Sequence, residues 1–134
     1  MVDASHANLA LVKSTYEGAS SQENGRNLQQ ALSPDATWIE ARGFPYAGTY
    51  TGFEAIAQNV FRRLAQEWIG YKVVIEDYVA SGDRVVAYGT YSGVHKGTGK
   101  AFEARVAHLW KVVEGRIVSF EQFVDSVPVV EAMG

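Results

Sequence analysis

The sequence predicts an α+β protein in which helices cover one face of a long, curved antiparallel sheet. Apolar residues recur at helical spacing in the first half of the chain, and the period changes near Gly70. The second half is rich in Val, Tyr and Phe and is interrupted by short turn signals. With no linker, repeat or low-complexity segment in between, these features predict a single domain over residues 1–134.

Three helices and one strand are expected in the first half. The first helix runs from about Asp3 to Ser20, where apolar or aromatic residues repeat at offsets of three and four: Leu9, Val12, Tyr16 and Ala19. A short helix over residues 24–32 ends at Ser33-Pro34. A strand with Trp38 and Ile39 follows, and Gly52 leads into a third helix over residues 53–68.

Four strands are expected from Gly70 onward, over residues 70–80, 83–96, 100–113 and 115–127. Three turn signals separate them, at residues 81–83, 97–99 and 114–115. A two-residue loop at Glu114-Gly115 pairs Val113 with Arg116. Continued without a bulge, this register places Ala107 opposite Gln122 and Leu109 opposite Phe120.

The same register assigns His108 and Trp110 to the outer face of the sheet, where we expect them to form part of a homodimer surface. The three histidines have no metal-binding spacing, so no metal is expected. The sequence has no nucleophile elbow and no phosphate-binding loop.

Composition excludes several classes of function. The formal net charge is −3 and the basic residues are scattered, so neither nucleic acid nor an anionic membrane is an expected partner. The absence of cysteine rules out disulfides and thiolate chemistry. No signal peptide or membrane-spanning stretch is indicated, and we expect a soluble, cytoplasmic protein.

Glu40 is the most unusual residue of the first strand. Side chains alternate along a strand, so Glu40 shares a face with Trp38, while Ile39 takes the other face. A carboxylate beside a tryptophan is either at an exposed edge, where it can pair with Arg42 or Arg105, or an ionisable group placed in an apolar site.

Several segments together resemble the SnoaL-like group of the nuclear transport factor 2-like superfamily, which includes ketosteroid isomerases, polyketide cyclases and limonene epoxide hydrolase. They are Tyr16, DATWIE at 35–40, AGTYTG and the helix after it, the EDYVASGDRVV hairpin and the final ARVAHLWKVVEGRIVSFEQFVD run. The resemblance spans essentially the whole chain. It implies a cone-shaped sheet with an apolar pocket at its open end, and a fold that hosts many chemistries.

The resemblance to ketosteroid isomerases implies roles for individual residues. Glu40 falls on their catalytic aspartate and Tyr16 on their oxyanion-binding tyrosine, with the same separation of 24 positions. Their protonated aspartic acid is replaced by Ala107, and the predicted register offers the carboxamide of Gln122 in its place. Asp125 falls near the catalytic aspartate of the epoxide hydrolases.

The expected function is therefore an isomerase or cyclase that abstracts a proton next to a carbonyl of a small hydrophobic, ring-containing molecule, without a cofactor. The expected core or pocket lining is Trp38, Phe53, Val60, Phe61, Ala107, Leu109, Phe120 and Phe123. A non-catalytic ligand-binding or dimerisation module is the main alternative, and an epoxide hydrolase is the third. If these residues have no catalytic role, Tyr16 and Gln122 are structural and Asp125 ends a strand or caps a helix.

Overall fold

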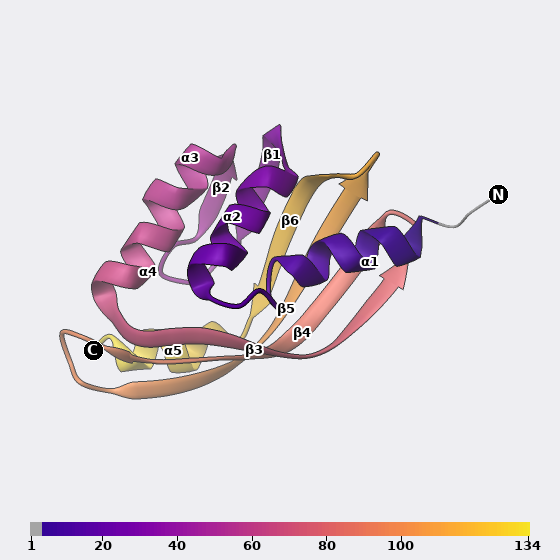
Figure 1. The fold of residues 1–134 in the computed structure, drawn as a ribbon. Helices are drawn as coiled ribbons and strands as arrows, with labels where there is room; N and C mark the ends of the chain where they lie inside the picture. The colour runs from indigo at the N-terminus through magenta and orange to yellow at the C-terminus, as the bar shows by residue number, and fades with distance from the viewer. Residues whose placement is uncertain (1–3) are drawn as a thin grey trace.

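The computed structural model describes residues 4–134, and within this range the helices gather on one face of a strongly curved sheet (Figure 1). This arrangement confirms the predicted α+β class. The first half contains α1 (Ser5–Ser14), α2 (Ser21–Ala31), β1 (Leu32–Glu40), β2 (Gly48–Thr51), α3 (Phe53–Ile56), the π-helical segment η1 (Ala57–Phe61) and α4 (Arg62–Glu67). The second half contains β3 (Trp68–Ser81), β4 (Arg84–His95), β5 (Ala101–Val113), β6 (Arg116–Val124) and α5 (Ser126–Ala132).

The first helix is shorter than predicted, and its expected start at Asp3 lies outside the described residues. It ends at Ser14, where the hydroxyls of Ser14 and Thr15 bond to carbonyls of the last helical turn. The second helix begins earlier than predicted, because the side chain of Ser20 accepts a hydrogen bond from the backbone N–H of Glu23. Together, α3, η1 and α4 confirm the predicted third helix.

Within residues 4–134 the strands form one six-stranded sheet with the order β2-β1-β6-β5-β4-β3. The antiparallel meander from β3 to β6 confirms the prediction. The sequence did not reveal that β1 pairs in parallel with β6, or that the four-residue strand β2 pairs with β1. This pairing places the end of β1, with Glu40, beside β6.

The last predicted strand is too long, because α5 begins at Ser126. Pro128 is the third residue of this helix. Proline is tolerated in the first helical turn, where backbone N–H groups have no intrahelical acceptor. Pro128 is therefore consistent with a helix start rather than with a continuing strand.

The covered face of the sheet, called the inner face below, contains most of the core. One cluster of buried residues joins α1, α2 and α3 to the sheet through Trp38, Trp110 and Phe120. A second cluster lies toward α5 and the start of β3 and includes Tyr46, Trp68, Tyr91 and Phe102. The site described next lies where these clusters meet. None of the helices within residues 4–134 has the length and apolar character needed to cross a bilayer.

Candidate functional site

Glu40 ends β1 with its carboxyl group on the inner face, and only 5% of its surface is exposed. Its strand neighbour Trp38 is equally buried and stacks on Phe120 of β6 at 3.7 Å between ring centroids. Within residues 4–134, no ion pair joins Glu40 to Arg42 or Arg105. The arrangement therefore matches an ionisable group in an apolar site rather than an exposed edge.

Burial raises the pKa of Glu40 to about 8, because the charged form loses its hydration. The nearby indole of Trp38 opposes part of this rise in pKa, although the two side chains form no hydrogen bond of normal geometry. Within the described chain, the Oε2 atom of Glu40 and the Nε1 atom of Trp38 are both buried without a hydrogen-bond partner. An unpaired buried acceptor beside an unpaired buried donor is costly.

A chain of hydrogen bonds runs across the inner face from Tyr16, in the turn after α1, to Gln122 of β6. The indole N–H of Trp110 donates to the Tyr16 hydroxyl at 2.9 Å, and that hydroxyl bonds Nδ1 of His108 at 2.5 Å. On the other side of the ring, His108 Nε2 bonds the Tyr91 hydroxyl at 2.5 Å. Gln122 then donates to the same hydroxyl at 3.1 Å.

Gln122 connects this chain to the strand end that carries Glu40. Its Oε1 atom accepts a hydrogen bond from the backbone N–H of Ala41 at 3.0 Å, while its Nε2 atom bonds Tyr91. Both ends of one carboxamide are therefore used to hold the Tyr91 hydroxyl near the residue that follows Glu40. Tyr16 lies at the opposite end of the chain.

Burial keeps Tyr16, His108 and Tyr91, the ionisable groups of this hydrogen-bond chain, neutral. It lowers the pKa of the His108 imidazole to about 3. It raises the pKa of Tyr16 and that of Tyr91 well above the ordinary value, with smaller contributions from neighbouring tyrosines and, for Tyr91, from Glu40. The hydrogen-bond chain therefore consists of neutral donors and acceptors at any pH near 7.

The predicted register between β5 and β6 is wrong beyond the turn. Val113 pairs with Arg116 as predicted, and the left-handed φ angles of Glu114 (51°) and Gly115 (76°) suit a two-residue hairpin loop. A β-bulge between these strands then shifts the pairing by one residue, so Gln122 pairs with His108. A shift of one residue moves every later side chain of the strand to the other face.

The structure corrects five placements made from the sequence. The two residues assigned to the outer dimer face, His108 and Trp110, are buried on the inner face. The three predicted pocket residues Ala107, Leu109 and Phe123 lie on the outer face instead, where Phe123 is 50% exposed. The position predicted for the missing acid, Ala107, is thus not on the inner face, and its two neighbours Val106 and His108 are buried instead.

The other predicted lining residues remain on the inner side. Trp38, Val60 and Phe120 are buried in the core, while Phe53 and Phe61 are partly buried against it. Asp125 is exposed at the start of α5, and its side chain does not cap that helix. Asp125 thus differs from the buried Glu40 in its exposure to solvent, and the epoxide hydrolase alternative stays a prediction.

An open cavity of about 650 Å³ lies between α2, α4 and the start of β3. Its lining includes Leu28, Phe61, Trp68 and Tyr71, and among the described residues that line it neither Glu40 nor Tyr16 occurs. Tyr71 stands between the two regions, since its ring packs against Tyr91 at 5.3 Å between centroids. The charge of Glu40 also helps to raise the pKa of Tyr71, after burial.

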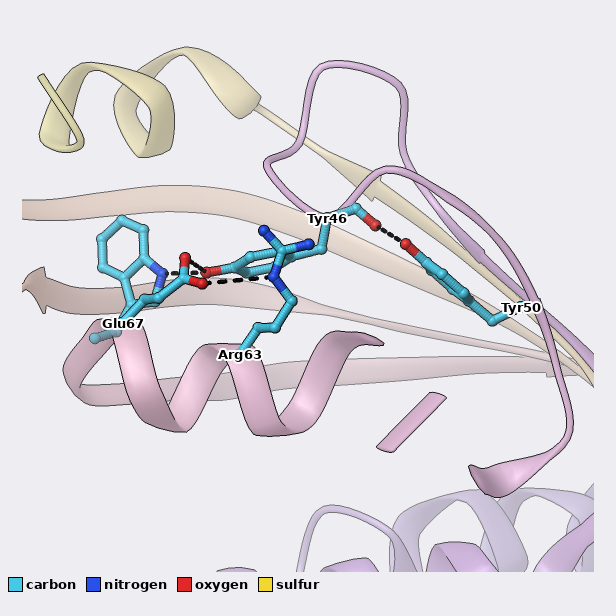
Figure 2. Close-up of polar contacts among 5 residues, drawn as sticks. Tyr46, Tyr50, Arg63 and Glu67 are labelled. Carbon is cyan, nitrogen blue, oxygen red and sulfur yellow. Dashed lines mark hydrogen bonds and ion pairs between the residues drawn. The ribbon is translucent and has the colours of Figure 1, made fainter. Parts of the chain in front are cut away.

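The loop between β1 and β2 is tied to α4 near this cavity (Figure 2). The Tyr46 hydroxyl donates to Glu67 at 2.7 Å and accepts from the Trp68 indole at 2.9 Å. Arg63 pairs with Glu67 and lies over the Tyr46 ring, and Tyr50 donates to the Tyr46 carbonyl. These contacts fix the loop that follows Glu40 against the helix that borders the cavity.

Sequence reasoning did not identify Tyr91 as part of this site. The alternation Val85, Ala87, Gly89, Tyr91 along β4 was the available signal, because it points Tyr91 to the same face as three small or apolar residues. Within residues 4–134, no group of three or more His, Asp or Glu side chains comes together as a candidate metal site.

Comparison with known proteins identifies relatives of the whole chain. The family model of the SnoaL-like domain matches residues 12–120. A nuclear transport factor 2-like protein from Burkholderia thailandensis E264 is 41% identical, with a TM-score of 0.90 over 100% of this chain and 99% of that one. Comparison with curated protein sequences gives no match.

More distant solved structures share the fold. A nuclear transport factor 2-like protein of unknown function from Burkholderia pseudomallei K96243 is 23% identical, with a TM-score of 0.82 over 93% of this chain and 95% of that one. A protein from Jannaschia sp. CCS1, described as a SnoaL-like polyketide cyclase, is 21% identical, with a TM-score of 0.79 over 98% and 94%. At these identities the likeness concerns the fold alone.

Proposed function

Because the chain belongs to the SnoaL-like domain family, we propose that it is an isomerase or cyclase that acts next to a carbonyl of a small hydrophobic ring compound. The single observation that carries this proposal is Glu40, a carboxylate buried on the inner face with one oxygen left without a partner. Burying an unpaired carboxylate lowers stability, and a purely structural role would not offset that loss.

The proposed step is proton abstraction by Glu40 from a carbon next to the carbonyl. A pKa of about 8 makes Glu40 a far stronger base than an exposed glutamate, and it remains partly ionised near neutral pH. The enolate that forms needs hydrogen-bond donors at its oxygen. The unpaired indole N–H of Trp38 and a hydroxyl of the Tyr16–His108–Tyr91 chain supply such donors.

A β,γ-unsaturated cyclic ketone such as 3-cyclohexenone gives a direct test. Glu40 would remove a proton from the carbon between the carbonyl and the double bond and return it at the far end of the double bond. The product is the conjugated ketone, which is followed by its ultraviolet absorbance. We expect turnover by the wild type and a loss of about a thousandfold in Glu40→Gln, because the amide cannot accept the proton.

Glu103→Gln is the matched control, because Glu103 is an exposed residue on β5. It should retain the wild-type rate. Equal turnover by wild type and Glu40→Gln would show that Glu40 is not the base.

A non-catalytic binding module is the second candidate, and the cavity favours it. That space of about 650 Å³ is lined by residues of α2, α4 and β3, and Glu40 and Tyr16 are not among the described residues that line it. A binder predicts that 3-cyclohexenone shifts the NMR signals of Tyr71 and Phe61 without any turnover. The isomerase predicts turnover that is lost in Glu40→Gln.

We also propose a homodimer through the outer face of the sheet, now without His108 and Trp110. Phe123 is half exposed on this face and pairs with Ala107 of β5. An exposed aromatic beside a small residue suits a contact with a second copy. Light scattering at micromolar concentration should give twice the chain mass of 14.7 kDa, and Phe123→Glu should lower it. A monomeric wild type would contradict this proposal.

A further inference from the structure

The Tyr16–His108–Tyr91 chain has more hydroxyl protons than acceptors. Each tyrosine oxygen already accepts one N–H, from Trp110 at Tyr16 and from Gln122 at Tyr91. The imidazole between them is neutral, so one ring nitrogen donates and the other accepts. Only one of the two hydroxyls can therefore donate to His108, and the other must direct its proton elsewhere.

The tautomer of His108 decides which hydroxyl proton is left over. With the proton on Nε2, the imidazole donates to Tyr91 and accepts from Tyr16, and the Tyr91 proton is free. With the proton on Nδ1, the imidazole donates to Tyr16, and the Tyr16 proton is free instead. The two tautomers thus move one hydrogen-bond donor between the two ends of the chain.

The surroundings of the two ends favour a free proton on Tyr91. Among the described residues, the Tyr16 hydroxyl has no hydrogen-bond partner besides His108 and Trp110. The Tyr91 hydroxyl is held by Gln122, whose other end binds the backbone N–H next to Glu40. Glu40 lies near this end, since its charge contributes to the raised pKa of Tyr91, and its Oε2 is buried without a hydrogen bond to Tyr91 or to any other described residue.

We propose that Tyr91, kept as a donor by the Nε2–H tautomer of His108, is the hydroxyl that binds the carbonyl oxygen of the substrate at Glu40. Tyr16 and His108 are then positioning residues, and Tyr16 acts on the substrate only through His108. The inference rests on the proposed function for its substrate, a ketone whose acidic carbon faces Glu40 while its oxygen accepts from Tyr91. No covalent bond to Tyr91 forms or breaks.

The tautomer can be measured without any substrate. In ¹⁵N-labelled protein, long-range proton–nitrogen spectra distinguish a protonated Nε2 from a protonated Nδ1, and His108→Asn assigns the signal against His6 and His95. We expect the Nε2–H form of His108, unchanged between about pH 5 and pH 9 because burial lowers its pKa to about 3. A protonated Nδ1 would overturn the inference.

Ligand binding identifies the donor independently of turnover. The ¹³Cζ resonance of a tyrosine moves when its hydroxyl gains an acceptor, so the probe is 2-cyclohexenone, added to protein labelled at tyrosine. We expect the Tyr91 signal to move and the Tyr16 signal to stay, with Tyr91→Phe and Tyr16→Phe supplying the assignments. A moving Tyr16 signal with a fixed Tyr91 signal would refute the assignment of Tyr91.

Turnover of 3-cyclohexenone gives the third comparison. Tyr91→Phe should lower kcat by about 10²–10³-fold, because it removes a donor at the oxyanion. Tyr16→Phe should lower kcat by only about tenfold, and its His108 spectrum should show a gain of the Nδ1–H form, which a merely structural defect would not produce. Tyr78→Phe is the control, since Tyr78 packs near Tyr16 but donates to Glu17 instead.

The outcomes separate the two proposals. A wild type that binds 2-cyclohexenone at Tyr91 but does not turn over 3-cyclohexenone loses the isomerase function while Tyr91 remains the donor. A wild type that turns over the ketone, with a larger loss in Tyr16→Phe than in Tyr91→Phe, keeps the function and refutes the role of Tyr91.

Discussion

The free energy of unfolding should decrease with rising pH in the wild type, and replacing Glu40 by glutamine should remove most of that decrease. The pKa of Glu40 is about 8 in the folded chain and 4.5 for an ordinary glutamate. The folded state therefore holds the proton more tightly than the unfolded state, and stability is greatest below 4.5 and falls as the pH rises toward 8. At about 1.36 kcal/mol per pKa unit, the full loss is about 5 kcal/mol.

Urea denaturation followed by tryptophan fluorescence measures this loss, because Trp38, Trp68 and Trp110 are all buried. Between about pH 5 and about pH 9, the wild type should lose about 4 kcal/mol of unfolding free energy through Glu40. Glu40→Gln has no charge to bury, so its stability should change much less over the same range. At high pH the variant should be the more stable protein.

The control for this experiment is Glu103→Gln, which removes an exposed carboxylate from β5. It should keep the wild-type slope of stability against pH. If the wild type and Glu40→Gln show the same slope of stability against pH, then folding does not raise the pKa of Glu40. Both the raised pKa and the proposed base would then be refuted.

Three further results are expected. The kcat/KM of the wild type for 3-cyclohexenone should rise with pH and level off above about 8, since only ionised Glu40 accepts a proton; a pH-independent kcat/KM would contradict this. Tyr46→Phe should cost about 1–3 kcal/mol in urea denaturation, because it leaves the buried Trp68 N–H without its acceptor; an unchanged midpoint would show that this contact is neutral. Gly89→Ala should lower the free energy of unfolding by about 2–3 kcal/mol, because its Cβ would overlap the backbone of Val74. Gly25→Ala meets open space in α2 and should raise the free energy of unfolding by about 0.5–1 kcal/mol.

Local sequence patterns were sufficient for the fold class and for the face that Glu40 occupies. The alternation of Trp38 and Glu40 along one strand depends only on the pleat of the backbone, which no distant contact alters. Helical spacing identified the segment from Phe53 to Glu67 in the same way. These inferences needed no knowledge of which strand lies beside which.

Placements across strands were less secure, because they depend on a register that one extra residue changes. The predicted pairing of Ala107 with Gln122 is wrong by one position, and that error exchanged the faces of His108 and Ala107. Nothing within the β6 segment itself marks the bulge, since Ile117, Val118 and Ser119 are all ordinary strand residues. The parallel pairing of β1 with β6 joins residues about eighty positions apart, and no local pattern reports it.

Deleting Val118 tests whether the bulge alone determines which side chains of β6 lie on the inner face. Ile117 pairs with Val112 and Ser119 pairs with Lys111, so Val118 is the extra residue. Its removal leaves Gln122 opposite His108 and should cost only about 1–2 kcal/mol in urea denaturation, with the ¹⁵N signals of His108 retained. Deleting Glu121 instead turns Gln122 away from Tyr91 and should abolish those signals or the fold. Because both deletions shorten β6 by one residue, equal damage by the two would mean that strand length, and not the bulge, positions Gln122.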